Sequence, residues 1–120
     1  HPIAMAQEAL SNQAACEGRF ALGLGVSHHW VVEGQLGLAY ERPARQLRSY
    51  LEVLNAALAG PGQVDVENDG YRVHSPIDVT DYAPTKILLA ALGPVLLHQA
   101  LVIANPKPVP SRTPLVVAPT

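Results

Sequence analysis

The sequence is short of cysteine and of charge. Cys16 is the only cysteine among 120 residues, so an internal disulfide and a cysteine-rich metal site are both excluded. Charged residues make up 15% of the chain and the formal net charge is −2, so there is no electrostatic reason to expect nucleic acid or an anionic membrane as a partner. A single unpaired cysteine fits a reducing compartment, and we expect a cytoplasmic protein.

Long hydrophobic runs are missing as well. No stretch reaches the roughly 18 apolar residues of a membrane span, and the N-terminus lacks the residue order of a signal peptide. We therefore expect no membrane partner. Hydrophobic residues nevertheless form 48% of the chain, which is typical of a folded protein and leaves room for one domain.

Two segments have the apolar spacing of helices. Residues 2–16 start with Pro2, which suits a first helical turn, and end at Glu17-Gly18. A stronger helix follows Pro43 and stops at Gly60-Pro61-Gly62. Its apolar stripe, which we expect in the core, consists of Leu47, Tyr50, Leu51, Leu54, Ala57 and Leu58.

Short apolar runs bounded by glycine or proline predict buried strands. These runs cover residues 20–26, 87–92, 101–104 and 115–117. Residues 64–66 and 71–73 flank Asn68-Asp69-Gly70, which predicts a hairpin. The remaining segments are expected to be loops at 27–41 and 75–85 and a short helical stretch at 95–100. Strands that alternate with helices predict an α/β fold.

A histidine-rich segment, Ser27-His28-His29-Trp30, follows the first predicted strand. Adjacent histidines point in different directions and no carboxylate cluster completes a site, so we expect no metal. Ser27 lacks the Gly-x-Ser-x-Gly elbow of a hydrolase, and Gly23-x-Gly25 lacks the third glycine of a dinucleotide site. A position at a strand end favours a role beside a cofactor, whereas the alternative is local hydrogen bonding only.

Other polar or aromatic residues have structural interpretations. Trp30 is either a cover for a flavin ring or a buried loop anchor. Glu41 is expected to cap or pair at the start of the helix after Pro43. His74 and His98 are expected to be structural or to face solvent.

Several segments, taken in order, resemble the luciferase-like monooxygenase superfamily. The first is Gly18-Arg19-Phe20-Ala21-Leu22-Gly23-Leu24-Gly25-Val26-Ser27-His28, which is similar to a family hallmark at the end of a barrel strand. Further matches lie at residues 37–43, 48–54, 70–73 and 89–94. The resemblance covers residues 1–100 well and 101–120 loosely. It is stronger to the deazaflavin-dependent oxidoreductases, which use coenzyme F-420, than to true luciferases.

The resemblance implies a (β/α)8 TIM barrel, of which residues 1–120 would be a partial domain. It also implies hydride transfer between a deazaflavin and a small organic substrate. Gly25, Val26, Ser27 and His28 would lie beside the deazaflavin, with Ser27 and His28 as the catalytic candidates. Ala91, Leu92, Gly93 and Pro94 would hold the cofactor phosphate, and a strand that ends in Gly-Pro before a helix does expose N–H groups suited to an anion.

Two other functions stay open: an FMN-dependent monooxygenase of the same fold, and a non-catalytic remnant that acts through association. A full barrel needs about 250 residues, and parallel strands need connections of roughly a dozen residues. We therefore expect the chain to omit residues before His1 and within 97–114, where Pro106, Pro108, Pro110 and Pro114 prevent a helix. Such a chain would expose strand edges, which predicts a homo-oligomer.

Overall fold

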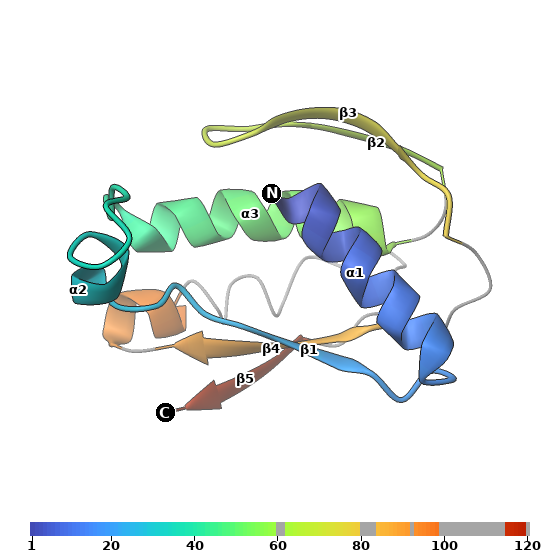
Figure 1. The fold of residues 1–120 in the computed structure, drawn as a ribbon, viewed down its shortest axis with the longest axis horizontal. Coiled ribbons are helices and arrows are strands. Elements are labelled where there is room, and N and C mark those ends of the chain that lie inside the picture. Colours follow the sequence, from blue (N-terminus) through green and yellow to red (C-terminus); the bar gives the residue numbers. More distant parts are fainter. Residues whose placement is uncertain (60–61, 80–83, 92, 99–114, 120) are drawn as a thin grey trace.

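The computed structural model describes residues 1–59, 62–79, 84–91, 93–98 and 115–119. Its elements form three layers, with a long helix between a parallel sheet on one side and a separate hairpin on the other (Figure 1). The buried apolar side chains of these layers form one core.

Helix α1 (Pro2–Ala15) confirms the helix predicted over residues 2–16. It ends where Glu17 and Gly18 have φ values of 51° and 81°. The Gly18 N–H donates to the Gln13 carbonyl at 3.0 Å. A left-handed residue after the last turn is a common helix cap that favours glycine, which is why Glu17-Gly18 marks the end in the sequence.

The long helix α3 (Pro43–Leu58) confirms the second predicted helix. Its apolar stripe packs in the core as expected, since Leu47, Leu51, Leu54, Ala57 and Leu58 are each 7% exposed or less. Tyr50 is only half-buried. Helices α1 and α3 pack against each other, so the two amphipathic faces cover one another and the sheet.

Three parallel strands form the sheet, in the order β1 (Ala21–Leu24), β4 (Lys86–Ala91) and β5 (Leu115–Pro119). Leu22 lies opposite Ile87, and both are buried against the helices. Helices packed on parallel strands confirm the α/β class. The strands predicted at 20–26, 87–92 and 115–117 are therefore confirmed, except that Leu92 lies outside the described residues.

Gln13 ties α1 to the sheet. Its side chain is 0% exposed, and Nε2 donates to the Pro84 carbonyl at 2.9 Å. The Phe20 N–H donates to Gln13 Oε1 at 2.8 Å. Because Phe20 directly precedes β1 and Pro84 lies two residues before β4, one amide aligns the beginnings of two neighbouring strands.

The hairpin consists of β2 (Gly62–Glu67) and β3 (Arg72–Ile77), paired antiparallel. Its turn is organised by Asn68, whose Oδ1 accepts from the Gly70 and Tyr71 N–H groups at 3.0 and 2.9 Å. Nδ2 of the same residue donates to the Ser49 carbonyl at 3.0 Å, which fixes the turn to α3. The predicted hairpin is confirmed.

Two loop predictions are corrected. Residues 75–77 belong to β3, although Pro76 suggested a loop. Each strand of a two-stranded hairpin is an edge strand, where proline is tolerated, and Ile77 continues the alternating burial that begins at Val73. The predicted loop 27–41 contains the one-turn helix α2 (His29–Val32).

Residues 94–98 are helical, in agreement with the start of the stretch predicted at 95–100. The predicted strand 101–104 and the proline-rich segment 105–114 lie outside the described residues. Within the ranges that the structure describes, no helix has both the length and the apolar character needed to cross a membrane.

Candidate functional site

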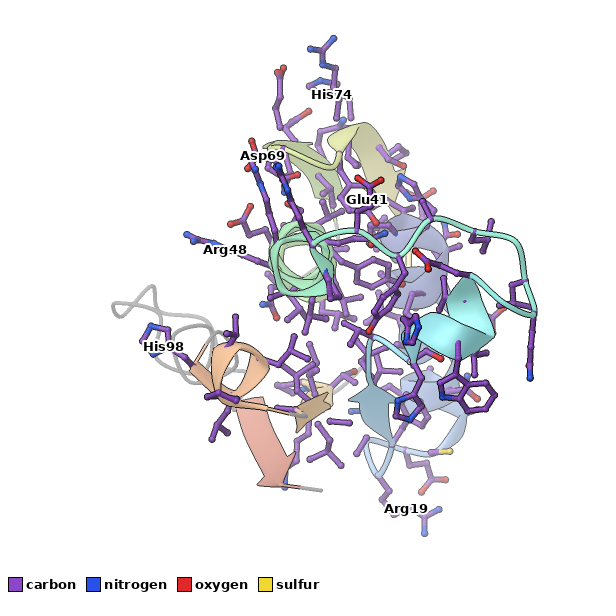
Figure 2. The ribbon with its side chains drawn as sticks, turned by 90° about the vertical axis from the view of Figure 1, so that its left-hand side faces the viewer. Arg19, Glu41, Arg48, Asp69, His74 and His98 are labelled. Atoms are coloured by element: carbon purple, nitrogen blue, oxygen red, sulfur yellow. The ribbon has the colours of Figure 1, made fainter. Side chains whose placement is uncertain are left out.

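The ends of β1 and β4 lie at one edge of the sheet because the strands are parallel and Leu24 is in register with Leu89. Gly25 continues from β1 beside Ala90, and a Cβ built on Gly25 would lie 3.4 Å from the Ala90 Cβ. Figure 2 looks onto this edge. It corresponds to the carboxyl ends of the strands, where α/β proteins bind ligands.

A hollow of about 720 Å³ lies at this edge. We call it the strand-end hollow. Its lining consists of Gly25, Val26, Ser27, His28, His29, Trp30, Tyr40, Ala90 and Leu96. All four residues predicted beside the cofactor at the end of the first strand therefore line one cavity, together with the aromatic rings of Trp30 and Tyr40 and a small residue from β4.

Ser27 and His28 project from a strained turn. Ser27 has a φ of 63°, a left-handed conformation that costs free energy for any residue with a Cβ. Both side chains are exposed, and the His28 ring stacks on Trp30 with the centroids 6.1 Å apart and an angle of 14°. The His28 carbonyl accepts from the Val31 and Val32 N–H groups, which begins α2 directly after the turn.

Tyr40 is a member of the site that the sequence did not indicate. Its hydroxyl donates to the Ser27 carbonyl at 3.0 Å, and its backbone N–H donates to Glu33 Oε1 at 3.2 Å. The first bond joins the end of the 27–40 loop to its start, and the second joins it to the middle of the loop. A tyrosine 13 residues from its partner in an irregular segment has no spacing that a sequence pattern could have revealed.

The segment 91–94, which was predicted to hold the cofactor phosphate, is divided between two places. Ala91 is 8% exposed and faces the core, and Leu92 lies outside the described residues. Gly93 and Pro94 line a separate groove of about 950 Å³ between α3 and the helical segment 94–98. From this part of the chain, Ala90 lines the strand-end hollow, and Leu96 lines both that hollow and the groove.

Arginine side chains border that separate groove, and two of them already have partners. Arg45 pairs with Asp69 at 2.7 Å and Arg48 with Glu52 at 3.4 Å. In Figure 2, Arg48 projects sideways from α3, and Asp69 lies above the helix at the tip of the hairpin. No sequence pattern indicated a role for these arginines, which lie off the apolar stripe of α3.

Residues with expected structural roles lie away from the strand-end hollow. His74 and His98 are exposed and lie at the periphery (Figure 2), and His74 Nδ1 is 2.8 Å from Asp65 Oδ1. The capping role expected of Glu41 is wrong, because Arg42 is the N-cap residue of α3 and no side chain caps that helix. Trp30 is 56% exposed, so it is not a buried anchor.

Among the described residues, no three His, Cys, Asp or Glu side chains gather as ligands for a metal ion. Burial raises the pKa of Tyr50, with the neighbouring Tyr71 adding to the effect, and burial also raises the pKa of Tyr71. Both tyrosines lie between α3 and the hairpin, so these shifts concern the packing there.

Comparison with known proteins agrees with this arrangement. The family model described as luciferase-like monooxygenase matches residues 1–118. A protein of Mycobacterium tuberculosis named "Putative coenzyme F420-dependent oxidoreductase" is 35% identical over 72 residues. That match includes 60% of this chain and 21% of the relative, so the chain spans about a fifth of that protein's length. The chain belongs to the luciferase-like monooxygenase family.

Proposed function

We propose that the chain supplies part of the cofactor site of a deazaflavin-dependent oxidoreductase, which transfers a hydride to or from a small organic substrate. The observation that supports this most is the strand-end hollow, where Gly25, Val26, Ser27 and His28 meet. In this proposal the parallel sheet is a fragment of a (β/α)8 barrel, whose chemistry takes place at the carboxyl ends of the strands.

The residues of the strand-end hollow fit a flat, polar-edged ring. Its volume of about 720 Å³ falls within the usual range for ligand pockets, about 300–1,000 Å³. Gly25 and Ala90 leave the floor open because they carry little or no side chain. Ser27 and His28 provide hydrogen-bonding groups at one border, and Trp30 provides an aromatic surface.

The bound cofactor would supply the hydride chemistry, and the protein would bind it and control its surroundings. Ser27 Oγ would donate a hydrogen bond to the cofactor or substrate. A His28 ring nitrogen would hold the proton that leaves or reaches the substrate as its oxidation state changes. Trp30, stacked on His28, would help to hold the orientation of that ring.

Titration of the full chain with F-420 and FMN tests the choice of cofactor. We expect tighter binding of F-420 by calorimetry, and a binding-dependent change in the absorption of the deazaflavin. Tighter binding of FMN would favour the monooxygenase of the same fold. Binding of neither would favour a non-catalytic remnant.

A second experiment tests the location. Ala90→Leu places a larger side chain next to Gly25, on the floor of the strand-end hollow. We expect at least a tenfold loss of cofactor affinity with little change in melting temperature, because Ala90 is exposed. Ala56→Leu, at an exposed position of α3, is the matched control. Equal affinity in both variants would place the cofactor elsewhere.

We also propose that the chain forms homo-oligomers. Within the described part of the sheet β1 and β5 are the outer strands, and Trp30, Leu36 and Leu38 are 56%, 62% and 59% exposed. Uncovered strand edges and apolar side chains favour association. Light scattering should give a mass above 12.8 kDa. A monodisperse particle of 12.8 kDa would contradict the proposal.

A further inference from the structure

We infer that Tyr40 is a positioning residue, which acts through the Ser27 carbonyl to hold Ser27 and His28 in their orientation at the strand-end hollow. This inference rests on the proposed function, because it assigns Tyr40 to the same cofactor site. The evidence for it comes from the geometry of the 27–40 loop.

The backbone of Ser27 is strained. A φ of 63° is left-handed, and serine does not favour this region. The strained residue stands between Val26, which lines the strand-end hollow, and His28. A change of φ at Ser27 would therefore turn His28 and all that follows away from the sheet edge, so an interaction has to hold this conformation.

The Tyr40 hydroxyl provides that interaction. It donates to the carbonyl of the strained residue itself, Ser27, at 3.0 Å. Tyr40 is only half-exposed and lies three residues before the start of α3, and its N–H donates to Glu33 Oε1 within the same loop at 3.2 Å. The bond to Ser27 thus connects the strained turn to the end of the loop that leads directly into α3.

Tyr40 also has a place in two cavities. It lines the strand-end hollow and a second hollow of about 520 Å³ beside it, which is bordered by α1 and the start of α3. Gly25 and Val26 are shared by both hollows. The ring is therefore part of the wall between the cofactor site and the helices, and its loss would affect the shape of the strand-end hollow as well as the turn.

Trp30 provides a readout that needs no cofactor. It is the only tryptophan of the chain, and it stacks on His28. Tyr40→Phe removes the hydroxyl and keeps the ring. We expect this variant to shift the Trp30 emission and raise its quenching by acrylamide, and to weaken F-420 binding about fivefold, as for one lost hydrogen bond.

Tyr71→Phe is the matched control. It makes the same chemical change at a half-buried tyrosine whose ring meets Tyr50 edge-to-face on the hairpin side of α3. We expect unchanged Trp30 emission and F-420 affinity in this variant. If Tyr40→Phe left the Trp30 emission as unchanged as Tyr71→Phe does, the inference would be overturned, whether or not the chain binds F-420.

A double-mutant cycle with Ser27→Gly separates positioning from a general loss of packing. Glycine adopts positive φ readily, so the turn then needs less support from Tyr40. Tyr40→Phe should change Trp30 quenching less in the Ser27→Gly background than in the native one. An equal change in both backgrounds would show that Tyr40 does not act through the Ser27 backbone. If F-420 fails to bind the native chain, the proposed function fails while the Trp30 measurements still decide the role of Tyr40.

Discussion

The core between α1, α3 and the hairpin differs sharply from the 27–40 loop beside the sheet edge. In the core, Leu10, Leu51 and Leu54 are all 0% exposed, and packing holds the elements together. In the loop, Trp30 and Leu38 are more than half exposed, and the bonds of Tyr40 join its ends. Stability and the proposed chemistry therefore depend on separate residues, so substitutions should affect one without the other.

The largest effect is expected in the core. Leu51→Ala removes a side chain that is fully buried in α3, and leaves a cavity. We expect the free energy of unfolding to fall by about 2–5 kcal/mol in urea denaturation. Leu36→Ala, at a site 62% exposed in the loop, should change it by less than about 0.5 kcal/mol. Similar losses in the two variants would remove the contrast between core and loop.

A polar contact in the core should have the next largest effect. Gln13→Ala leaves the Pro84 carbonyl and the Phe20 N–H without their partner. We expect a loss of about 1–3 kcal/mol in the free energy of unfolding, because unpaired buried groups are costly. Gln13→Met keeps the volume and should lose a similar amount. Gln7→Ala, at an exposed position of α1, serves as the control. A stable Gln13→Met would show that Gln13 acts only by filling space.

The loop should show the opposite behaviour. His28→Ala removes an exposed ring from the strand-end hollow, so we expect at least a tenfold loss of F-420 affinity or turnover, about 1.4 kcal/mol. The melting temperature should hardly change. His74→Ala, on the hairpin, should alter neither the affinity nor the turnover. If His28→Ala left both unchanged, His28 would be a loop histidine with only local contacts.

The core was the more predictable region because its pattern is periodic. The stripe from Leu47 to Leu58 and the short apolar runs indicated the helices and strands, and Asn68-Asp69-Gly70 indicated the turn. Pro76 led to the wrong prediction of a loop, because proline is excluded from central strands but tolerated in edge strands.

The loop was less predictable because its contacts follow no period. Its general position followed from the rule that sites lie at strand ends. The bond between Tyr40 and Ser27 depends on the path of an irregular segment. The role of Gln13 was hidden for a similar reason, since one polar residue on a helix does not reveal which backbone groups it will meet. Both residues act through side-chain hydrogen bonds to backbone groups outside their own element, which composition and spacing do not encode.

The smallest effect is expected on the outer face of the hairpin, where Asp65 and His74 lie opposite each other. The His74 ring nitrogen donates to the Asp65 carboxylate at 2.8 Å, and this bond, with a weaker one from Gln63, lowers the pKa of Asp65 below 3.8. A lowered pKa means that the folded state favours the charged carboxylate. Its stabilising effect is therefore complete well above pH 3.8, fades as the pH falls past that value, and is gone below the lowered pKa.

Asp65→Asn should accordingly flatten the dependence of unfolding free energy on pH in the acid range, and should lower that free energy at neutral pH by the same amount. Both changes should be small, because the pair is exposed and screened. Thermal melts between pH 2 and 7 would measure this. Asp78→Asn, another exposed carboxylate beyond the end of β3, removes the same charge without that partner and controls for net charge. Since the pair lies on the hairpin, Asp65→Asn should leave Trp30 emission unchanged. If the native protein and Asp65→Asn gave superimposable acid profiles, the pair would not stabilise the hairpin. If Asp65→Asn changed the Trp30 emission, the core and the loop would be coupled after all.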